Sequence, residues 1–383
     1  MTCLKATATF ILLSGMFLLI ANIFSGVGVE HTPKFKEPMQ IEQKEQDENL
    51  FRNGTTKYEG WARHPIWRYM RSFVKANPLR IKEWDYYATY IAPLNIYICT
   101  TVSDLGYIGL YSLSVIDLNE KKFSQKDRFT PLPLGTIRLP PTSLHEHTLT
   151  YNGIGLQMRI QKYHHVRRLQ VNSSGIVLPN GQKGIYIDLH MHHPTGNESL
   201  NIQTSWAHNR YNFYMNEKVN GMPTYGSVVM GDQTYNITNG SYTVLDFGRG
   251  YWPYSSTWYW GSATGVLDDG QKIGFNLGYG FSDRTPASEN CIFYKGKIHK
   301  LSEIEFHIPS NPMDTWTITS DNGHFEGKFT PIVLRHADSN LLVLRSLQNQ
   351  YFGNYSGTLK LTNGREIKFE NIPGFAEKVY SRW

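Results

Sequence analysis

Residues Ile185–His192 read IYIDLHMH, and the pattern of these eight residues indicates the fold class. Its aliphatic residues occupy every second position, with polar or aromatic residues between them. Side chains of a β-strand point alternately to opposite faces of a sheet, so the pattern predicts a strand with one face on a hydrophobic core. The same alternation recurs at residues 156–161 and 273–279. These segments predict a body built largely of half-buried strands.

Turn signals separate the strand-like segments. Asn152-Gly153, Asp269-Gly270 and Asn363-Gly364 lie next to or between such runs, where a tight hairpin turn needs positive φ. Aromatic residues make up 14% of the chain and charged residues 18%, a mixture typical of strands and turns. Many short strands with turns between them predict an all-β fold of antiparallel barrels or sandwiches, without βαβ units.

The best helical candidate beyond the N-terminus is His64–Trp84. Trp67, Met70, Phe73 and Val74 would share one face of a helix there. Two prolines within the segment limit the length of such a helix. The segment is therefore predicted as one short helix that packs on the core.

The N-terminal segment, residues 1–29, predicts a membrane anchor. No residue from Ala6 to Val29 is charged, and about 20 apolar residues suffice to cross a bilayer as a helix. The length favours a transmembrane signal-anchor over a cleaved signal peptide, for which Gly26–Gly28 would be the cleavage site. Residues 30–56 are polar and predict a flexible stem.

Six glycosylation sequons follow this segment and favour a lumenal or extracellular body, in a single-pass protein of the secretory pathway. Their acceptor residues are Asn53, Asn172, Asn197, Asn236, Asn239 and Asn354. Cys99 and Cys291 both lie in apolar strand-like runs, which favours buried thiols over a disulfide. The net charge of +6 is not concentrated along one face or in a motif, so nucleic acid is not an expected partner.

Several ordered blocks of the body resemble the family catalogued as domain of unknown function 2804. The most distinctive block is Leu245–Tyr254, LDFGRGYWPY, followed by Trp258-Tyr259-Trp260. The resemblance extends over residues 57–383, and its further blocks are Gly60–Arg63, Trp84–Tyr86, Glu198–Asn201, Gly274–Gly278, Glu289-Asn290, Gly296–Lys300, Gln350–Gly353, Tyr355–Thr358, Gly374–Glu377 and Arg382-Trp383.

This family looks related to the two-barrel, lipocalin-like superfamily of carotenoid hydratases and cofactor-free cyclases. The resemblance implies two tandem lipocalin-like (calycin-like) antiparallel barrels or half-barrels, joined near residue 220. The expected domains are therefore residues 57–220 and 221–383. The N-terminal anchor and the sequons depart from what many bacterial members of the family would need.

The densest polar site within aromatic sequence consists of Asp246 and Arg249. A carboxyl group held among aromatic rings has a raised pKa and can donate a proton, so Asp246 is a candidate acid with Arg249 as its partner. The alternative is an architectural ion pair at a corner of the fold. The expected ligand-contacting rings are those of Trp252, Tyr254, Trp258 and Trp260.

A second polar set consists of Asn276, Glu289, Asn290 and His299. Glu289 and His299 are candidates for proton transfer, and the two asparagines for ligand binding; ordinary structural hydrogen bonding is the alternative for His299. His190 and His192 share a strand face at a spacing that metal sites use. A third ligand would have to come from His164, His165 or Asp188, and no metal is expected.

The sequence predicts first a protein that binds a hydrophobic small molecule, such as a lipid or isoprenoid, in a barrel cavity. The alternatives are a cofactor-independent hydratase, isomerase or cyclase and a scaffold with filled barrels. No GxSxG, P-loop, CxxC or dinucleotide-binding motif is present, so hydrolase, kinase and nicotinamide chemistry lose support and no cofactor is expected. Protein partners cannot be predicted.

Overall fold

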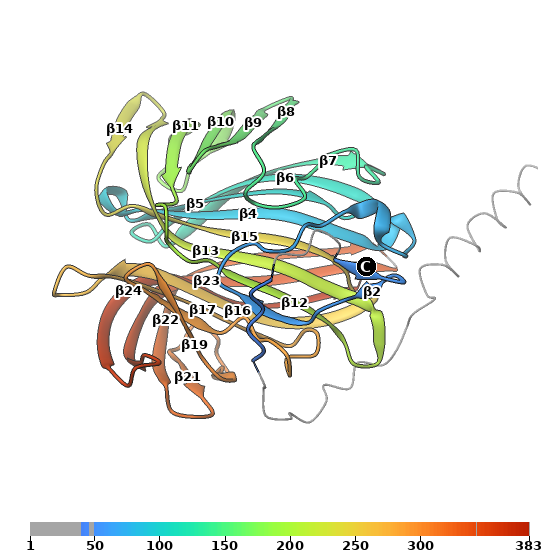
Figure 1. The fold of residues 1–383 in the computed structure, drawn as a ribbon. Helices are drawn as coiled ribbons and strands as arrows, with labels where there is room; N and C mark the ends of the chain where they lie inside the picture. Colours follow the sequence, from blue (N-terminus) through green and yellow to red (C-terminus); the bar gives the residue numbers. More distant parts are fainter. Residues whose placement is uncertain (1–39, 46–49, 342, 383) are drawn as a thin grey trace, which may run out of the picture.

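The computed structural model describes residues 40–45, 50–341 and 343–382, which fold into β-strands and three short 3-10 turns. The two large sheets form a nearly closed barrel and a half-barrel (Figure 1). The all-β prediction is therefore confirmed. A separate two-stranded sheet near the N-terminus consists of β1 (Phe51–Arg52) and β2 (Thr55–Thr56).

The first sheet has 13 strands, and its main path runs in the order β7-β6-β5-β4-β15-β13-β11-β10-β9-β8. All the strand pairs in it are antiparallel, as in Tyr87 opposite Leu245 and Leu189 opposite Gly226. Its strands are β3 (Gly60–Ala62), β4 (Ile81–Ile91), β5 (Ile96–Asp104), β6 (Ile108–Asp117), β7 (Lys122–Pro131), β8 (His147–Gly153), β9 (Leu156–Tyr163), β10 (Val166–Val177), β11 (Lys183–His192), β12 (Leu200–Trp206), β13 (Asn209–Met230), β14 (Gln233–Ile237) and β15 (Tyr242–Tyr251).

The second sheet has nine strands in the order β19-β18-β17-β16-β24-β23-β22-β21-β20. The chain passes into it between Tyr251 and Ser255, whereas residue 220, the expected division, lies inside β13. Its strands are β16 (Ser255–Val266), β17 (Lys272–Tyr279), β18 (Cys291–Tyr294), β19 (Lys297–Lys300), β20 (Ile304–His307), β21 (Trp316–Ser320), β22 (Phe325–Leu341), β23 (Leu344–Lys360) and β24 (Glu366–Arg382).

Each sheet curves around a hydrophobic core of its own. In the first sheet, Phe213 of β13 and Phe247 of β15 belong to one buried cluster with Ile187 of β11. In the second, Phe275 and Phe325 pack against each other with ring centroids 5.1 Å apart. The alternation of IYIDLHMH is confirmed, because its aliphatic residues are all buried in the first core.

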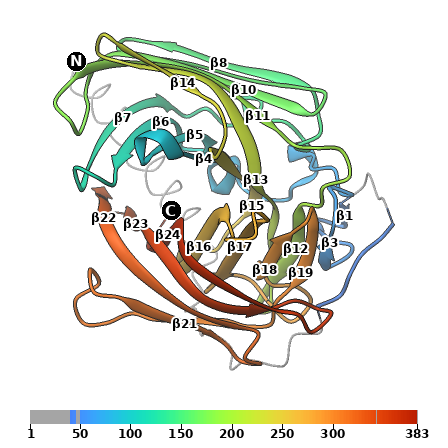
Figure 2. The same cartoon turned by 90° about the vertical axis from the view of Figure 1, so that its left-hand side faces the viewer.

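The outer faces of the two sheets pack against each other. Figure 2 shows β4–β7 lying across from β16 and β22–β24. Tyr97 and Cys99 of β5 meet Phe352 and Phe375 of the second sheet in a third buried cluster. A strand such as β4 or β16 therefore has one face on the core of its own sheet and the other face on the opposite sheet.

The helix predicted at His64–Trp84 is wrong. The segment contains only the 3-10 turns η1 (Arg71–Phe73) and η2 (Pro78–Arg80) before β4 begins, and a third such turn, η3 (Ala92–Leu94), follows β4. Trp67 and Tyr69 are buried whereas Arg68 and Met70 are exposed. This period of two belongs to extended chain, and Pro78 cannot continue a helical hydrogen-bond ladder.

The predicted anchor and the stem up to residue 39 lie outside the described residues. No helix within residues 40–45, 50–341 and 343–382 has the length and apolar character needed to cross a bilayer. The described part of the stem is held in place: Ile41 N–H donates to the Pro286 carbonyl at 2.8 Å, and Gln43 N–H donates to the Trp61 carbonyl at 2.7 Å. The flexible stem predicted for residues 30–56 is thus wrong for residues 40–43, and also for residues 51–56, which contain the paired strands β1 and β2.

Cys99 and Cys291 are both buried free thiols, which confirms the favoured prediction. Four sequon asparagines (Asn53, Asn172, Asn236 and Asn239) are exposed, and Asn197 and Asn354 are half-buried. Glycosylation itself stays a prediction.

We expect Phe275→Ala to destabilise the protein by about 3–5 kcal/mol, because it leaves a void in a core where this ring is fully buried. The matched substitution Phe73→Ala, at a half-exposed ring, should change the free energy of unfolding by at most about 0.5 kcal/mol. Chemical denaturation of both variants measures the difference. Equal costs would contradict the placement of these two rings.

Candidate functional site

A cavity of about 160 Å³ lies between the two sheets, not in the interior of either one. Side chains from both sheets converge on it, so it exists only because the two outer faces meet. The residues that line it are Trp84, Tyr86, Thr101, Ser103, Leu105, Leu110, Tyr214, Lys218, Asp246, Trp252, Trp258, Trp260, Phe281, Glu289, Arg335, Gln348, Gln350, Glu377 and Val379.

Aromatic rings in mutual contact form one wall of the cavity. Trp252 lies at its centre, with ring centroids 4.9 Å from Tyr214, 5.4 Å from Trp258 and 5.9 Å from Trp84. The edge-to-face arrangement of these pairs is the one that aromatic quadrupoles favour. This rigid apolar wall suits a ligand with a flat or hydrocarbon surface.

An ionic group occupies the side of the cavity formed by β13 and β15. The buried Lys218 Nζ lies 2.9 Å from Asp246 Oδ1 and 3.4 Å from Glu289 Oε1. Lys218 also lies over the Trp260 ring, 4.2 Å from its centroid, and Asn216 Nδ2 donates to Asp246 Oδ1 at 2.6 Å. Burial raises the pKa of Glu289, while the charge of Lys218 opposes that shift. One cation thus faces two carboxyl groups.

A third carboxyl group, that of Glu377 on β24, lies beside the aromatic wall. Trp258 Nε1 donates a hydrogen bond to Glu377 Oε1 at 3.0 Å. Burial raises the pKa of Glu377 to about 7, although this hydrogen bond lowers it. The negative charge of Asp246 raises it further, and the charge of Lys218 lowers it. Near neutral pH this group can therefore either give or take a proton.

Polar side chains connect the two sheets along another side of the cavity. Arg335 of β22 donates to Gln125 Oε1 at 2.8 Å and to Ser114 Oγ at 3.2 Å, both on the first sheet. Gln350 Nε2 of β23 donates to the hydroxyl of Tyr86 on β4 at 3.1 Å. These bonds fix the separation of the sheets and leave polar atoms at the cavity wall.

The structure brings together five of the predicted site residues. Asp246, Glu289, Trp252, Trp258 and Trp260 all line the cavity.

Asn276 and Asn290 lie behind the cavity wall. Asn276 Oδ1 accepts from Trp260 Nε1 at 2.8 Å, and Asn276 Nδ2 donates to the Glu289 carbonyl at 2.8 Å. Asn290 Oδ1 accepts from the Gly278 N–H at 2.7 Å. We assign both asparagines to positioning of the wall.

Arg249 is not the partner of Asp246, so that expected pairing is wrong. Residues three apart on a strand point to opposite faces, and Arg249 points away from the cavity. Its Nη2 lies 2.9 Å from Asp85 Oδ1, and its Nη1 donates to the Trp84 carbonyl at 2.7 Å. Arg249 therefore has an architectural role, but its ion pair is with Asp85 and not with Asp246, so the alternative of an Asp246–Arg249 corner pair is wrong as well.

Tyr254 and His299 also lie apart from the residues that line the cavity. The Tyr254 hydroxyl donates to the Val343 carbonyl, and His299 Nδ1 is bonded to Thr362 Oγ1 at 2.8 Å. In the pair formed by His190 and His192 on β11, His190 Nε2 lies 3.7 Å from Asp188 Oδ1. Within residues 40–45, 50–341 and 343–382, no group of three or more potential ligands is arranged to hold a metal ion.

Sequence reasoning missed Lys218, Glu377, Arg335, Gln350 and Tyr86. Tyr86, Gln350 and Glu377 lie in blocks that carried the family resemblance, and that was the available signal. For Lys218 there was none, because it lies in the long strand β13, where no motif marks it.

We expect Arg249→Gln to destabilise the protein by about 3–5 kcal/mol, because it leaves the buried Asp85 carboxylate without its countercharge. Urea denaturation measures this cost. Lys378→Gln, at a surface cation on β24, is the control and should be nearly neutral. If the Arg249→Gln protein were as stable as the parent but had an altered cavity, the prediction would be wrong and Arg249 would belong to the residues that shape the site.

The chain is similar to several solved structures of low sequence identity. An AttH-like protein from Nitrosomonas europaea is 11% identical over 82% of this chain and 95% of its own, with a TM-score of 0.48. Kievitone hydratase from Nectria haematococca is 13% identical over 78% and 88%, with a TM-score of 0.42. CghA with Sch210972 is 6% identical over 88% and 97%, with a TM-score of 0.39.

No curated protein sequence matches the chain. The family described as "Domain of unknown function (DUF2804)" matches residues 40–383, which include every strand of both sheets and all the residues that line the cavity. The chain therefore belongs to this family.

Proposed function

We propose that this protein is an enzyme that moves a proton to or from a small, largely apolar molecule bound between the two sheets. Hydration, isomerisation and cyclisation belong to this class of reaction. The observation that carries the proposal is Glu377, a half-buried carboxyl group that faces an aromatic cavity and accepts a hydrogen bond from Trp258, with a pKa raised to about 7. A scaffold would need neither the cavity nor an acid poised at that pH.

The surroundings of Glu377 suit a proton donor. A general acid works best when its pKa lies near the working pH, because it is then protonated often enough and still releases its proton readily. The Trp258 N–H holds the carboxyl group in one orientation. The aromatic wall excludes water, so that the proton passes to the ligand and not to solvent.

The Lys218 group supplies the complementary charge. Asp246 and Glu289 share this one cation, so they can accept a proton or stabilise positive charge that develops on the ligand. Gln350 and Arg335 offer hydrogen-bond donors to a polar end of the ligand, at the side where the sheets are linked. The acid and the base thus come from the chain's own side chains.

The second candidate is a binding protein for a lipid or isoprenoid, which the aromatic wall also favours. The cavity lies between the sheets, so it replaces the barrel interior that the sequence suggested as the binding site. We further infer a body on the lumenal or extracellular side, anchored through residues 1–29; the apolar leader and the six sequons support this placement.

We expect Glu377→Gln to lower turnover by about 100-fold or more, because the amide keeps the Trp258 hydrogen bond but cannot deliver a proton. The substrate should then remain in the cavity of the variant. Native mass spectrometry of the variant purified from its own cell, followed by extraction, identifies that molecule. Incubating it with the parent protein should yield a product changed by one water or an isomer separable by chromatography.

Glu366→Gln, at an exposed position on the same strand, is the control and should convert the molecule as the parent does. A molecule that both proteins bind and neither converts would refute the enzyme and support the binding protein. An empty cavity in every variant would count against both.

The pKa of Glu377 also predicts a dependence of stability on pH. The folded protein keeps this proton up to about pH 7, whereas the unfolded chain releases it near its ordinary pKa of 4.5. The contribution of this group to stability is therefore complete below about pH 4.5 and is lost as the pH rises through 7. Glu377→Gln removes this loss.

The melting temperature of Glu377→Gln, relative to that of the parent, should consequently be higher at pH 8 than at pH 5. Differential scanning calorimetry at both pH values measures it. In the parent, the rate should fall above about pH 7 as the acid ionises. A difference in melting temperature between the variant and the parent that is the same at pH 5 and pH 8 would show that folding does not raise the pKa of Glu377.

A further inference from the structure

A cluster of exposed apolar side chains surrounds one end of the first sheet, and we call these five residues the rim. Exposed apolar side chains on a soluble protein are normally scattered singly over the surface. The five side chains of the rim are instead grouped, because they come from two segments that lie next to each other. The exposed fractions are 37% for Met70, 46% for Phe73, 58% for Phe129, 60% for Leu132 and 45% for Leu134.

The two segments of the rim lie against each other. The Tyr69 N–H donates to the Pro141 carbonyl at 2.9 Å. A Cβ atom placed on Gly135 would lie 2.8 Å from Arg71 Nε. The turn that carries Met70 and Phe73 therefore contacts the loop that follows Leu134.

The rim adjoins the wall of the cavity. Phe129 stands opposite Leu110 in the β6–β7 register, and Leu110 lines the cavity. The Leu132 N–H donates to the Tyr107 carbonyl at 3.1 Å, in the loop that directly follows Leu105, another residue of the wall. A surface that covers the rim would thus meet this side of the cavity.

The backbone of the rim is strained. Leu132, Leu134 and Arg138 have φ values of 46°, 50° and 57°, in the left-handed region that glycine and asparagine adopt more readily. Folding stability alone would not place two exposed leucines there. Backbone strain of this kind collects at functional sites, where another demand fixes the side chain.

The exposed charges around the rim have one sign. Segments 68–80 and 128–138 contain six basic residues and no acidic residue. Arg68, Lys75 and Arg138 are exposed. Apolar side chains among exposed basic residues are the pattern by which a protein surface binds an anionic membrane.

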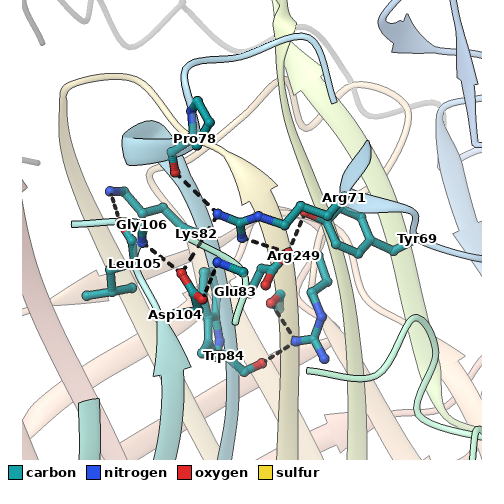
Figure 3. A network of polar contacts seen from close by, with 12 residues as sticks. Tyr69, Arg71, Pro78, Lys82, Glu83, Trp84, Asp104, Leu105, Gly106 and Arg249 are labelled. Atoms are coloured by element: carbon teal, nitrogen blue, oxygen red, sulfur yellow. Dashed lines mark hydrogen bonds and ion pairs between the residues drawn. The ribbon is translucent and has the colours of Figure 1, made fainter. Parts of the chain in front are cut away.

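A buried polar network holds the rim rigid from below. Figure 3 shows Arg71 beside Pro78, over Glu83 and Asp104. Arg71 Nη1 lies 3.0 Å from Glu83 Oε1, and Arg71 Nη2 donates to the Pro78 carbonyl at 3.2 Å. Asp104 accepts from the Gly106 N–H at 3.0 Å and from the Gly135 N–H at 2.7 Å. Both segments are therefore fixed to one another in the folded protein.

We propose that the rim docks on a membrane surface that contains anionic lipid, and so brings this side of the cavity to the bilayer. The apolar side chains enter the interface and the basic ones contact lipid phosphate and carboxylate groups. This docking is separate from the predicted N-terminal anchor and from the proposed proton transfer. It requires anionic lipid in the leaflet that faces the body, and it assigns that lipid surface to one end of the first sheet.

Hydrogen exchange of the full chain tests the proposal. Vesicles of phosphatidylcholine with phosphatidylserine should slow deuterium uptake in residues 68–75 and 128–138, and vesicles of phosphatidylcholine alone should not. The protection should be lost in Leu132→Asn/Leu134→Gly, because asparagine and glycine suit the left-handed backbone and keep the fold, and neither change creates a glycosylation sequon. It should also be lost in Arg68→Glu/Lys75→Glu/Arg138→Glu.

The matched controls remove equal features elsewhere. Val177→Asn/Val266→Asn replaces side chains that are 59% and 46% exposed, and Lys122→Glu/Lys183→Glu/Lys360→Glu reverses three exposed charges; both should keep the protection. No protection, or equal protection by neutral vesicles, would overturn the proposal. Protection that instead rises with protein concentration, without vesicles, would overturn it in favour of a contact between two copies. Unchanged melting temperatures show that the variants fold.

Discussion

The buried charge of Lys218 determines how the two sheets meet. A cation removed from water needs countercharges close by, and here they come from both sheets: Asp246 lies on β15 and Glu289 precedes β18. The indole of Trp260, on β16, covers the ammonium group. Sliding one sheet along the other would separate the charges in a medium where that is costly. The ionic group therefore fixes the register of the interface, and with it the shape of the cavity.

The position of the cavity follows from how the two cores are filled. Large rings such as Trp316 and Phe275 pack, fully buried, on the concave side of the second sheet. Where two twisted sheets meet on their outer faces, in contrast, the side chains do not interdigitate as regularly. Polar links such as that from Arg335 to Gln125 keep the faces apart. Space for a ligand thus arises between the sheets.

The sequence predicts the strands well because the period of two is a local property, as in residues 185–192. It also places Asp246 and Trp252 in the site, since they lie in one short aromatic block. It cannot place Lys218 or Glu377, because these residues lie on β13 and β24, which are far apart in the sequence and belong to different sheets. Only the packing of the two sheets brings both side chains to the cavity. The period of two would also have separated Asp246 from its supposed partner, because their positions differ by an odd number.

The same rule explains the error at residues 64–84. Apolar residues at positions 67, 70, 73 and 74 fit a helical face, but burial follows Trp67 and Tyr69 and leaves Met70 and Phe73 in solvent. Residues that the sequence assigned to a core thus became part of the rim. An apolar residue indicates a need to leave water without indicating the surface that will cover it, and only the tertiary structure separates these cases.

The charge of the cavity links ligand binding to the protonation of Glu377. Lys218 and Arg335 supply two positive charges to the cavity, so ionising Glu377 as well as Asp246 and Glu289 would leave one negative charge uncompensated. A neutral, apolar ligand displaces water and lowers the local dielectric, which raises the pKa of Glu377 further and keeps the acid protonated. A cationic ligand would do the opposite. The site therefore favours molecules that leave the carboxyl group of Glu377 protonated. Binding of such a molecule itself prepares the proposed proton transfer.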